Sequence, residues 1–295
     1  MKFFKSVFRR YRKEKLRYYL KGVDVLLITS SGRTGTQFFE TLYKNVDKNR
    51  LVIHEPKPDF FNLSLQKIRY GRSTKKVSEY IASHRGKIIL SKYGMSKRIF
   101  GKKIIYVESN PFAYPLLEEY RSLVKSFKVI YISRDPSTYL VSAYNKDPSK
   151  DEINNFYGES DKRKRLTAVD FKELSEKTWC NFERIEKIAW YWNKSNELLY
   201  DYTKKYKNDS IYIKFESLFS SSENEKISTL KKILYFSEGK SIDNIFLRDL
   251  LNLYTVKINK SSLLSEISNF EDLDSETQIR ITKIIEPMAK KLNYI

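Results

Sequence analysis

Short apolar runs recur along this chain and alternate with segments that have the period of an amphipathic helix. The runs lie at residues 23–28, 51–53, 104–107, 129–132 and 211–215, with 88–90 as a possible extra strand. The helical segments include 36–43, 114–125, 137–144 and 178–206. Short apolar runs between helices are typical of buried parallel strands. The sequence therefore predicts an α/β fold in which helices flank a parallel central sheet.

The length and composition favour one main domain. The chain has 295 residues, of which 41% are hydrophobic and 15% aromatic, and this content excludes a disordered protein. We expect a single domain over residues 23–295, mainly helical beyond residue 220 and ending in a helix at 276–292. Residues 145–177 are highly charged and have no clear apolar period, so we expect a mobile insertion there, of a length that is often functional.

The first 22 residues predict a basic amphipathic helix. They carry nine Lys or Arg against the single Glu14. Their apolar face comprises Phe4, Val7, Phe8, Tyr11 and Tyr18. Charges interrupt the apolar run and no small-residue cleavage site follows, so the segment is neither a signal peptide nor a membrane span. Two alternatives remain, in which the helix lies on an anionic membrane surface or docks on the domain.

Charge and cysteine usage restrict the chemistry further. The formal net charge of +20 favours anionic ligands without choosing among them, and part of it can reflect base composition. Cys180 is the only cysteine, which indicates a reducing compartment and a cytoplasmic protein, and its neighbours Trp179 and Phe182 suggest a packed thiol. With only His54 and His84 besides, no zinc cluster has its ligands, and we expect no metal.

A glycine-containing loop follows the first predicted strand. The sequence Ser30-Ser-Gly-Arg-Thr-Gly-Thr-Gln37 precedes the helical pattern that begins at Phe38. Glycines allow a tight turn, and the amides and positive dipole at the start of a helix attract anions. The loop predicts a phosphate cradle. It is no Walker A motif, because the glycine spacing fails and no Lys follows Gly35.

A second candidate element follows the fourth predicted strand. Arg134 stands where this strand ends, and Ser142 lies eight residues later on the next helix. Ligands of α/β proteins bind at the carboxyl ends of parallel strands, and the planar guanidinium of Arg suits a phosphate. Ser142 adds a hydroxyl about two helical turns further on.

Together the two elements resemble the sulfotransferase family that uses 3′-phosphoadenosine 5′-phosphosulfate (PAPS), and the resemblance implies a P-loop NTPase-like sulfotransferase fold. In that family the first loop holds the 5′-phosphosulfate, and the strand Arg with its Ser holds the 3′-phosphate. The residues that match the first motif are Arg33, Thr34, Gly35, Thr36 and Gln37, and Arg134 and Ser142 match the second.

The resemblance extends less firmly beyond Ser142. Residues 215–218 match a second strand end near the adenosine, and residues 257–261, with Lys260, match a late basic loop over the nucleotide. Phe215 replaces the Tyr of cytosolic members. Gln37 replaces the usual Ser or Thr, so a hydroxyl contact to the 5′-phosphate is lost while the backbone amide remains.

Transfer to a hydroxyl requires a base that removes its proton. We rank Glu55 first, Glu108 second and His54 third. Glu55 resembles the catalytic Glu of tyrosylprotein and several bacterial sulfotransferases, whereas Glu108 is nearest to the His that cytosolic members have after the third strand. The resemblance gives Arg33 the role of steadying charge on the transferring group and the leaving phosphate.

The motifs do not identify the acceptor, and two other functions are possible from the sequence. The loop and the Glu base resemble those of carbohydrate and tyrosyl enzymes, so we expect a glycan or glycolipid acceptor. The main alternative is a non-enzymatic basic protein that binds nucleic acid or an anionic membrane. A nucleotide kinase is the weaker alternative, because the cradle lacks its Lys.

Overall fold

A parallel sheet forms the centre of the protein. The computed structural model describes residues 14–94, 103–146, 156, 163–241, 243–255 and 267–295. In these ranges the strands are β1 (Val23–Ser30), β2 (Leu51–His54), β3 (Ile104–Ser109), β4 (Ser126–Ser133) and β5 (Ser210–Lys214). They pair in the order β2-β3-β1-β4-β5, and every neighbouring pair is parallel. The predicted α/β architecture with a parallel central sheet is confirmed.

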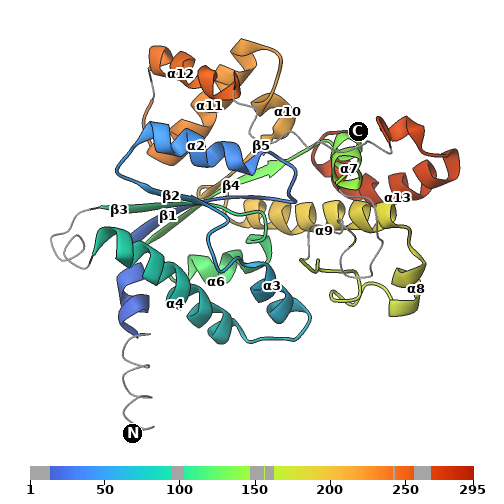
Figure 1. The fold of residues 1–295 in the computed structure, drawn as a ribbon, viewed down its shortest axis with the longest axis horizontal. Coiled ribbons are helices and arrows are strands. Elements are labelled where there is room, and N and C mark those ends of the chain that lie inside the picture. Colours follow the sequence, from blue (N-terminus) through green and yellow to red (C-terminus); the bar gives the residue numbers. More distant parts are fainter. Residues whose placement is uncertain (1–13, 95–102, 147–155, 157–162, 242, 256–266) are drawn as a thin grey trace, which may run out of the picture.

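Helices cover both faces of this sheet (Figure 1). Those in the first half of the chain are α2 (Thr36–Val46), α3 (Phe61–Ile68), α4 (Thr74–Tyr93), η1 (Tyr114–Leu116), α6 (Leu117–Arg121) and α7 (Pro136–Tyr144). The second half contributes α8 (Glu176–Asn181), α9 (Arg184–Lys205), α10 (Phe215–Leu218), α11 (Glu223–Glu238), α12 (Asn244–Leu251), η2 (Asn252–Thr255), η3 (Phe270–Asp272) and α13 (Ser275–Lys291). In Figure 1, α2, α11 and α12 lie on one side of the sheet, and α3, α4, α6 and α9 on the other.

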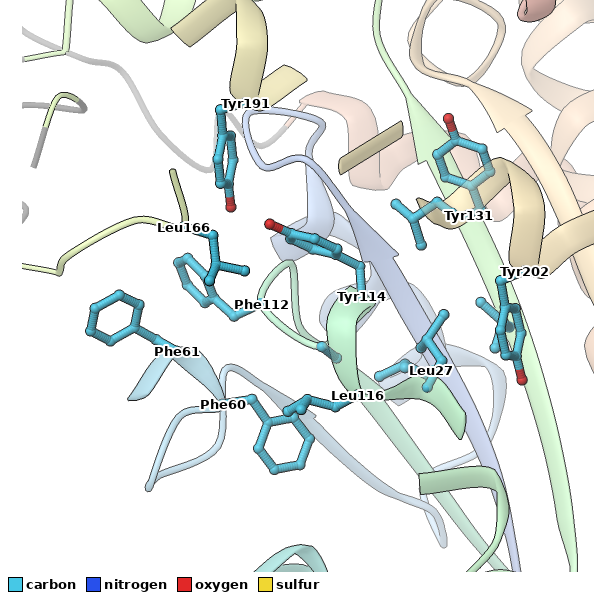
Figure 2. Packing of buried hydrophobic residues seen from close by; sticks show 14 of the residues in the cluster. Leu27, Phe60, Phe61, Phe112, Tyr114, Leu116, Tyr131, Leu166, Tyr191 and Tyr202 are labelled. Carbon is cyan, nitrogen blue, oxygen red and sulfur yellow. The ribbon is translucent and has the colours of Figure 1, made fainter. Parts of the chain in front are cut away.

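The core has two parts because successive strand residues point to opposite faces. Val25 and Leu27 of β1 pack into one buried cluster, whereas Leu26 and Ile28 pack into the other. The first cluster is rich in aromatic residues, and Figure 2 shows several of them, including Phe60, Phe112 and Tyr114. The buried strands thus read as continuous apolar runs, which is the pattern that predicted them.

Three predicted elements differ from the structure. Residues 88–90 belong to α4, because their apolar side chains continue the buried stripe of Val77, Ile81 and Ile89 rather than a strand. The helix expected over 114–125 is shorter, since η1 and α6 end at Arg121. The helix expected over 178–206 is two helices, because Glu183 and Glu186 form a capping box that starts α9 anew.

The charged segment 145–177 is partly core, not wholly the mobile insertion that was expected. Of this segment the structure describes residues 145–146, 156 and 163–177. Leu166 and Ala168 are buried in the first cluster, and Arg69 forms an ion pair with Asp170. The sequence did not predict these contacts, because one ion pair and a few isolated apolar residues produce no periodic hydrophobic pattern.

The N-terminal segment packs against the domain where the structure describes it. Residues 14–20 are helical, and Leu16, Tyr19 and Leu20 are buried. A Cβ built on Gly86 of α4 would lie 3.2 Å from the Leu16 Cβ, which shows how closely the two helices approach. Tyr18, assigned to the apolar face, is 68% exposed, so that assignment is wrong. The predicted face residues Phe4, Val7, Phe8 and Tyr11 lie outside the described residues.

Two further sequence expectations concern single features. Cys180 is exposed, whereas Trp179 is buried, because adjacent residues of α8 point in different directions. The expected packed thiol is therefore wrong. The final helix agrees with its predicted range within one residue at each end. Within the described ranges, none of the helices has the length and apolarity needed to cross a membrane.

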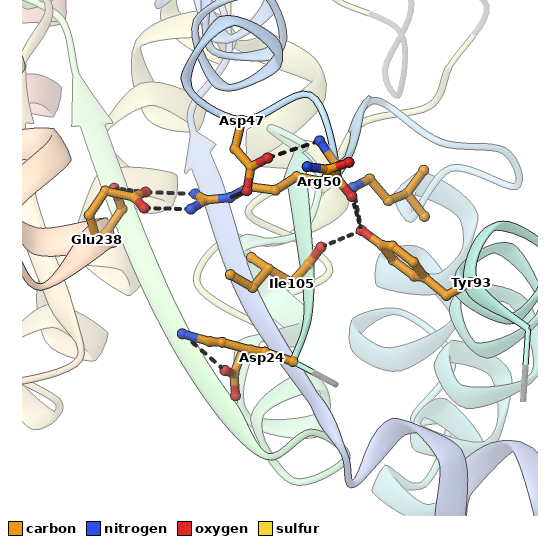
Figure 3. Close-up of polar contacts among 10 residues, drawn as sticks. Asp24, Asp47, Arg50, Tyr93, Ile105 and Glu238 are labelled. Carbon is orange, nitrogen blue, oxygen red and sulfur yellow. Dashed lines mark hydrogen bonds and ion pairs between the residues drawn. The ribbon is translucent and has the colours of Figure 1, made fainter. Parts of the chain in front are cut away.

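Polar contacts fix the outer strand β2 (Figure 3). Arg50, just before β2, forms an ion pair with Glu238 at the end of α11 and a second one, 3.2 Å long, with Asp47. The Tyr93 hydroxyl accepts a 2.7 Å hydrogen bond from the Leu51 amide and lies 3.0 Å from the Ile105 carbonyl. These contacts hold the strand that carries His54 at its end.

The strand order reverses direction at the carboxyl end of β1. The chain passes from β1 to β2 on one side of it and from β3 to β4 across it. In open α/β sheets, ligands bind at such a switch point, beyond the carboxyl ends of the strands. The loops after β1, β2, β3 and β4 all start from this edge.

Candidate active site

The loop after β1 has an unusual backbone. Gly32, Arg33 and Gly35 have positive φ angles of 89°, 55° and 68°. The Ser30 hydroxyl accepts hydrogen bonds from the Gly32 amide, at 3.0 Å, and from the Thr34 hydroxyl, at 2.7 Å. Turns of this kind form concave groups of amides that bind anions. Gly35 caps α2 without a side-chain hydrogen bond to the first amides of that helix.

Gly35 is also required by packing. A Cβ at this position would lie 2.6 Å from Cε2 and 2.7 Å from Cζ of Phe219, which is closer than a carbon contact allows. Phe219 follows α10, and its ring packs against Phe38 and Phe215. The loop therefore packs closely against the aromatic side chains of Phe215 and Phe219, which follow β5.

The two motifs predicted from the sequence meet in space. The Arg33 Nε donates a 3.1 Å hydrogen bond to the Ser142 hydroxyl, and the Arg134 Nη1 donates one of 3.1 Å to the Arg33 carbonyl. The Arg134 guanidinium stacks on the Phe215 ring at 4.6 Å. Two Arg side chains and a hydroxyl therefore lie together at the ends of β1 and β4.

Glu55 lies on the other side of this loop, just after β2. Its amide donates a 2.9 Å hydrogen bond to the Ser109 carbonyl at the end of β3, and its φ of 43° is in the left-handed region. The Arg163 Nη1 donates a 2.9 Å hydrogen bond to Glu55 Oε2. His54 Nε2 lies 3.7 Å from Glu55 Oε1. The carboxylate remains 25% exposed, so it is accessible from solvent.

A cavity of about 220 Å³ joins the loop after β1 to Glu55. Of the residues predicted from the sequence, its lining includes Arg33, Gly35, Thr36, Gln37, His54 and Glu55. Ser31 and Gly32 also line it and belong to the predicted phosphate cradle. The sequence had not pointed to Pro111, Phe112, Lys146, Arg163 or Arg165, which complete the described lining. The described lining thus carries four cationic side chains and one carboxylate.

The remaining predicted residues lie elsewhere. Thr34 is fully buried, and its hydroxyl fastens the loop to Ser30 instead of lining the cavity. Arg134 and Ser142 line a neighbouring depression of about 380 Å³ between α7 and residues 268–271. Lys260 falls outside the described residues.

Glu108, the second candidate base, is buried in the core. Its two carboxylate oxygens accept hydrogen bonds of 2.8 and 2.9 Å from Arg85, and both side chains are 0% exposed. Tyr106, Tyr120 and Asn110 also donate to this carboxylate. Burial lowers the pKa of Arg85, but the charge and hydrogen bonds of Glu108, together with the interactions of Tyr106 and Tyr120, outweigh this and leave the pKa raised. Glu108 is therefore sequestered from the cavity that Glu55 borders.

This buried pair supports the loops around the cavity. The Arg85 Nη1 donates a 3.0 Å hydrogen bond to the Pro58 carbonyl, three residues after Glu55. Asn110, which donates to Glu108, accepts a 3.0 Å hydrogen bond from the Phe112 amide. Burial foremost, and then the Glu108 charge, raise the pKa values of Tyr106 and Tyr120 far above the ordinary range, so both remain protonated donors.

The missed lining residues had a weak signal in the sequence. Arg163 and Arg165 belong to the charged segment 145–177, whose length alone had suggested a function. Both guanidinium groups stack on Phe112, at 4.3 and 4.9 Å from the ring centre. Figure 2 shows Phe112 beside Leu166, the neighbour of Arg165. Such long-range stacking leaves no pattern in the chain.

The residues present suit an anionic ligand better than a metal ion. Ser31 lines the cavity, and its buried hydroxyl has no hydrogen-bond partner within the described part of the chain. A buried hydroxyl of this kind is normally satisfied by water or by a ligand. In the same part of the chain, no group of three or more His, Cys, Asp or Glu is placed to hold a metal.

The fold is that of the sulfotransferases. The sulfotransferase domain from the curacin biosynthetic pathway superposes with a TM-score of 0.50 at 14% identity, over 92% of this chain and 98% of that one. The sulfotransferase domain from the Synechococcus PCC 7002 olefin synthase gives 0.46 at 13% identity, over 90% and 94%. Sulfotransferase STF9 from Mycobacterium avium gives 0.49 at 10% identity, over 97% and 81%.

The superposition on the curacin-pathway domain shows a shared fold and, at 14% identity, shows the fold alone. No family model matches the sequence. A search of curated proteins finds no match either.

Proposed function

We propose that this protein transfers a sulfuryl group from PAPS to a hydroxyl of its acceptor. The observation that carries the proposal is the convergence, in a sulfotransferase fold, of the loop after β1, the Arg33–Ser142–Arg134 cluster and Glu55 around one edge of the sheet. The first two supply donors for phosphate and sulfate oxygens. The third supplies a carboxylate within the same cavity.

The donor would extend from the loop after β1 toward β4. In this proposal Arg33, Gly35, Thr36 and Gln37 hold the phosphosulfate, and Thr34 keeps the loop in shape through Ser30. Arg134 and Ser142 hold the 3′-phosphate from the adjoining depression. Phe215 supports Arg134 by stacking. Lys260 remains a candidate residue of a loop that covers the nucleotide, and only the sequence match of residues 257–261 supports this.

Glu55 is the proposed base. As the acceptor oxygen forms its bond to sulfur and the bond from sulfur to the phosphate oxygen breaks, the hydroxyl proton passes to the Glu55 carboxylate. The leaving group is 3′-phosphoadenosine 5′-phosphate, and Arg33 steadies the negative charge that develops on it. Arg163 orients the carboxylate at 2.9 Å, and His54 contacts it from the strand.

The acceptor class and the setting remain parts of the proposal. Polar and charged side chains dominate the described lining, which favours a glycan or glycolipid acceptor. The basic N-terminal segment favours peripheral contact with an anionic membrane, and the lone Cys180 favours the cytoplasm.

A transfer assay tests the function. The protein is incubated with PAPS and with representative glycans, peptides or phenols, and both the sulfated product and 3′-phosphoadenosine 5′-phosphate are measured. The proposal expects stoichiometric formation of both with a glycan. Binding of duplex DNA or anionic vesicles without any transfer in the whole panel would favour the non-enzymatic alternative.

A further inference from the structure

The sheet order separates the proposed donor groups from the other cations of the cavity. Arg134 follows β4 and Phe215 follows β5, which lie on one side of β1. Glu55 follows β2 and Phe112 follows β3, which lie on the other side. A nucleotide that reaches from the β1 loop to Arg134 therefore extends away from Phe112. The acceptor must approach from the β2 and β3 side, where Glu55 lies.

Positive charge is concentrated on that acceptor side. Arg163 and Arg165 both stack on Phe112, which follows β3, and both line the cavity. Arg165 is only 4% exposed, so its charge acts in surroundings of low polarity, where attraction to an anion is stronger than in water. Glu55 is the one carboxylate in the described lining.

We infer that the acceptor carries an anionic group near the hydroxyl that is sulfated, as in a uronic acid or an already sulfated sugar. This inference rests on the proposed function and specifies its acceptor. Arg163 and Arg165 bind the anionic group, because guanidinium groups match the planar spacing of carboxylate and sulfate oxygens.

The contact between Arg163 and Glu55 gives this binding a catalytic consequence. A guanidinium group has five N–H donors in a planar fork, so the side chain that donates to Glu55 can contact a second anion with the same fork. An acceptor held by Arg163 therefore has its hydroxyl brought beside the Glu55 carboxylate. A neutral sugar gains neither the charge pairing nor this placement.

Paired sugars test the inference independently of turnover. Methyl β-glucuronide and methyl β-glucoside share their ring hydroxyls and differ at C6, which is a carboxylate in the first and a hydroxymethyl group in the second. We expect NMR titration, with the donor site saturated by 3′-phosphoadenosine 5′-phosphate, to show roughly tenfold to hundredfold tighter binding of the glucuronide. Arg163→Gln and Arg165→Gln should each remove most of this preference, and Arg165→Lys should retain part of it.

Controls separate this inference from the proposed function. Arg248→Gln removes the same charge from an exposed position on α12 and should leave the preference intact. Equal affinity for the two sugars, including no measurable binding of either, overturns the anionic acceptor while saturation by the bisphosphate still supports the donor site. If the bisphosphate itself does not bind, the proposed function fails, and the acceptor inference fails with it.

Discussion

Two residues beside the candidate site hold their backbones in a conformation that side chains disfavour. Arg33 and Glu55 have φ angles of 55° and 43°, and each follows a strand that ends at the cavity. Left-handed backbone costs roughly 1–2 kcal/mol in a residue with a Cβ. Such strain is typical of positions where geometry serves a ligand or a reaction. The two strained residues are thus the proposed phosphosulfate ligand Arg33 and the proposed base Glu55.

Gly35 is predicted to tolerate no side chain. Gly35→Ala should lower the free energy of unfolding by about 1–2 kcal/mol because of the φ of 68°, and by roughly 1–3 kcal/mol more because of the clash with Phe219. Gly239 has nearly the same φ, 69°, with open space around it, so Gly239→Ala should pay the backbone cost alone. Urea denaturation of the two variants gives the difference. Equal losses of stability would show that the Phe219 contact is not limiting.

Glu55 and Glu108 are predicted to fail in opposite ways. Glu55→Gln should lower turnover about a hundredfold to ten thousandfold, while bisphosphate affinity changes by no more than a few fold. Glu108→Gln should instead reduce the free energy of unfolding by roughly 3–5 kcal/mol, because it leaves Arg85 buried without its charged partner. His54→Ala should slow turnover less than Glu55→Gln.

Parallel kinetics and urea denaturation of these three variants distinguish the roles. A stable Glu108→Gln protein with collapsed turnover, next to near-normal turnover in Glu55→Gln, would transfer the base role to Glu108.

At the scale of elements, the sequence revealed what depends on local pattern. Buried parallel strands are continuous apolar runs, so all five were predictable, and the loops at their ends located Arg33, Glu55 and Arg134. Residues 88–90 were misjudged because three apolar residues fit a helix face as well as a strand. Arg163 and Arg165 were missed because their stacking on Phe112 joins segments about 50 residues apart.

The ion pair between Arg50 and Glu238 is predicted to make the attachment of β2 depend on pH. Burial raises the pKa of Glu238, but the hydrogen bond and charge of Arg50 outweigh it, so the pKa lies below its ordinary 4.5. A lowered carboxyl pKa stabilises the fold above the unfolded-state value, and this contribution disappears as pH falls through the folded-state value. Glu238→Gln should therefore cost about 1.5–3 kcal/mol at neutral pH.

Urea denaturation from neutral pH down to about pH 3 measures this effect. The difference between wild type and Glu238→Gln should shrink toward the acidic end, as the Glu238 carboxylate takes up its proton. Asp249→Asn, at an exposed site on α12, serves as the control. A difference that stays constant with pH would exclude the ion pair as its source.

At the scale of the whole molecule, the net charge of +20 suits a protein whose ligands are anions. Raising the ionic strength from about 0.01 M to about 1 M shortens the Debye length from about 30 Å to about 3 Å. At saturating PAPS, the KM for an acidic glycan should therefore rise severalfold over this range. The KM for a neutral glycan should hardly change. A salt response shared equally by both acceptors would point to a general effect on the protein.

The proposed donor site should recognise both phosphates of the PAPS product, and calorimetry measures this recognition. We expect 3′-phosphoadenosine 5′-phosphate to bind roughly tenfold to hundredfold more tightly than 5′-AMP, because a charge-assisted phosphate contact contributes about 1.5–3 kcal/mol. Arg134→Ala should remove most of this preference in a folded protein, while Arg248→Ala keeps it. Equal affinity of wild type for the two nucleotides, or a preference that survives in Arg134→Ala, would rule out this donor site.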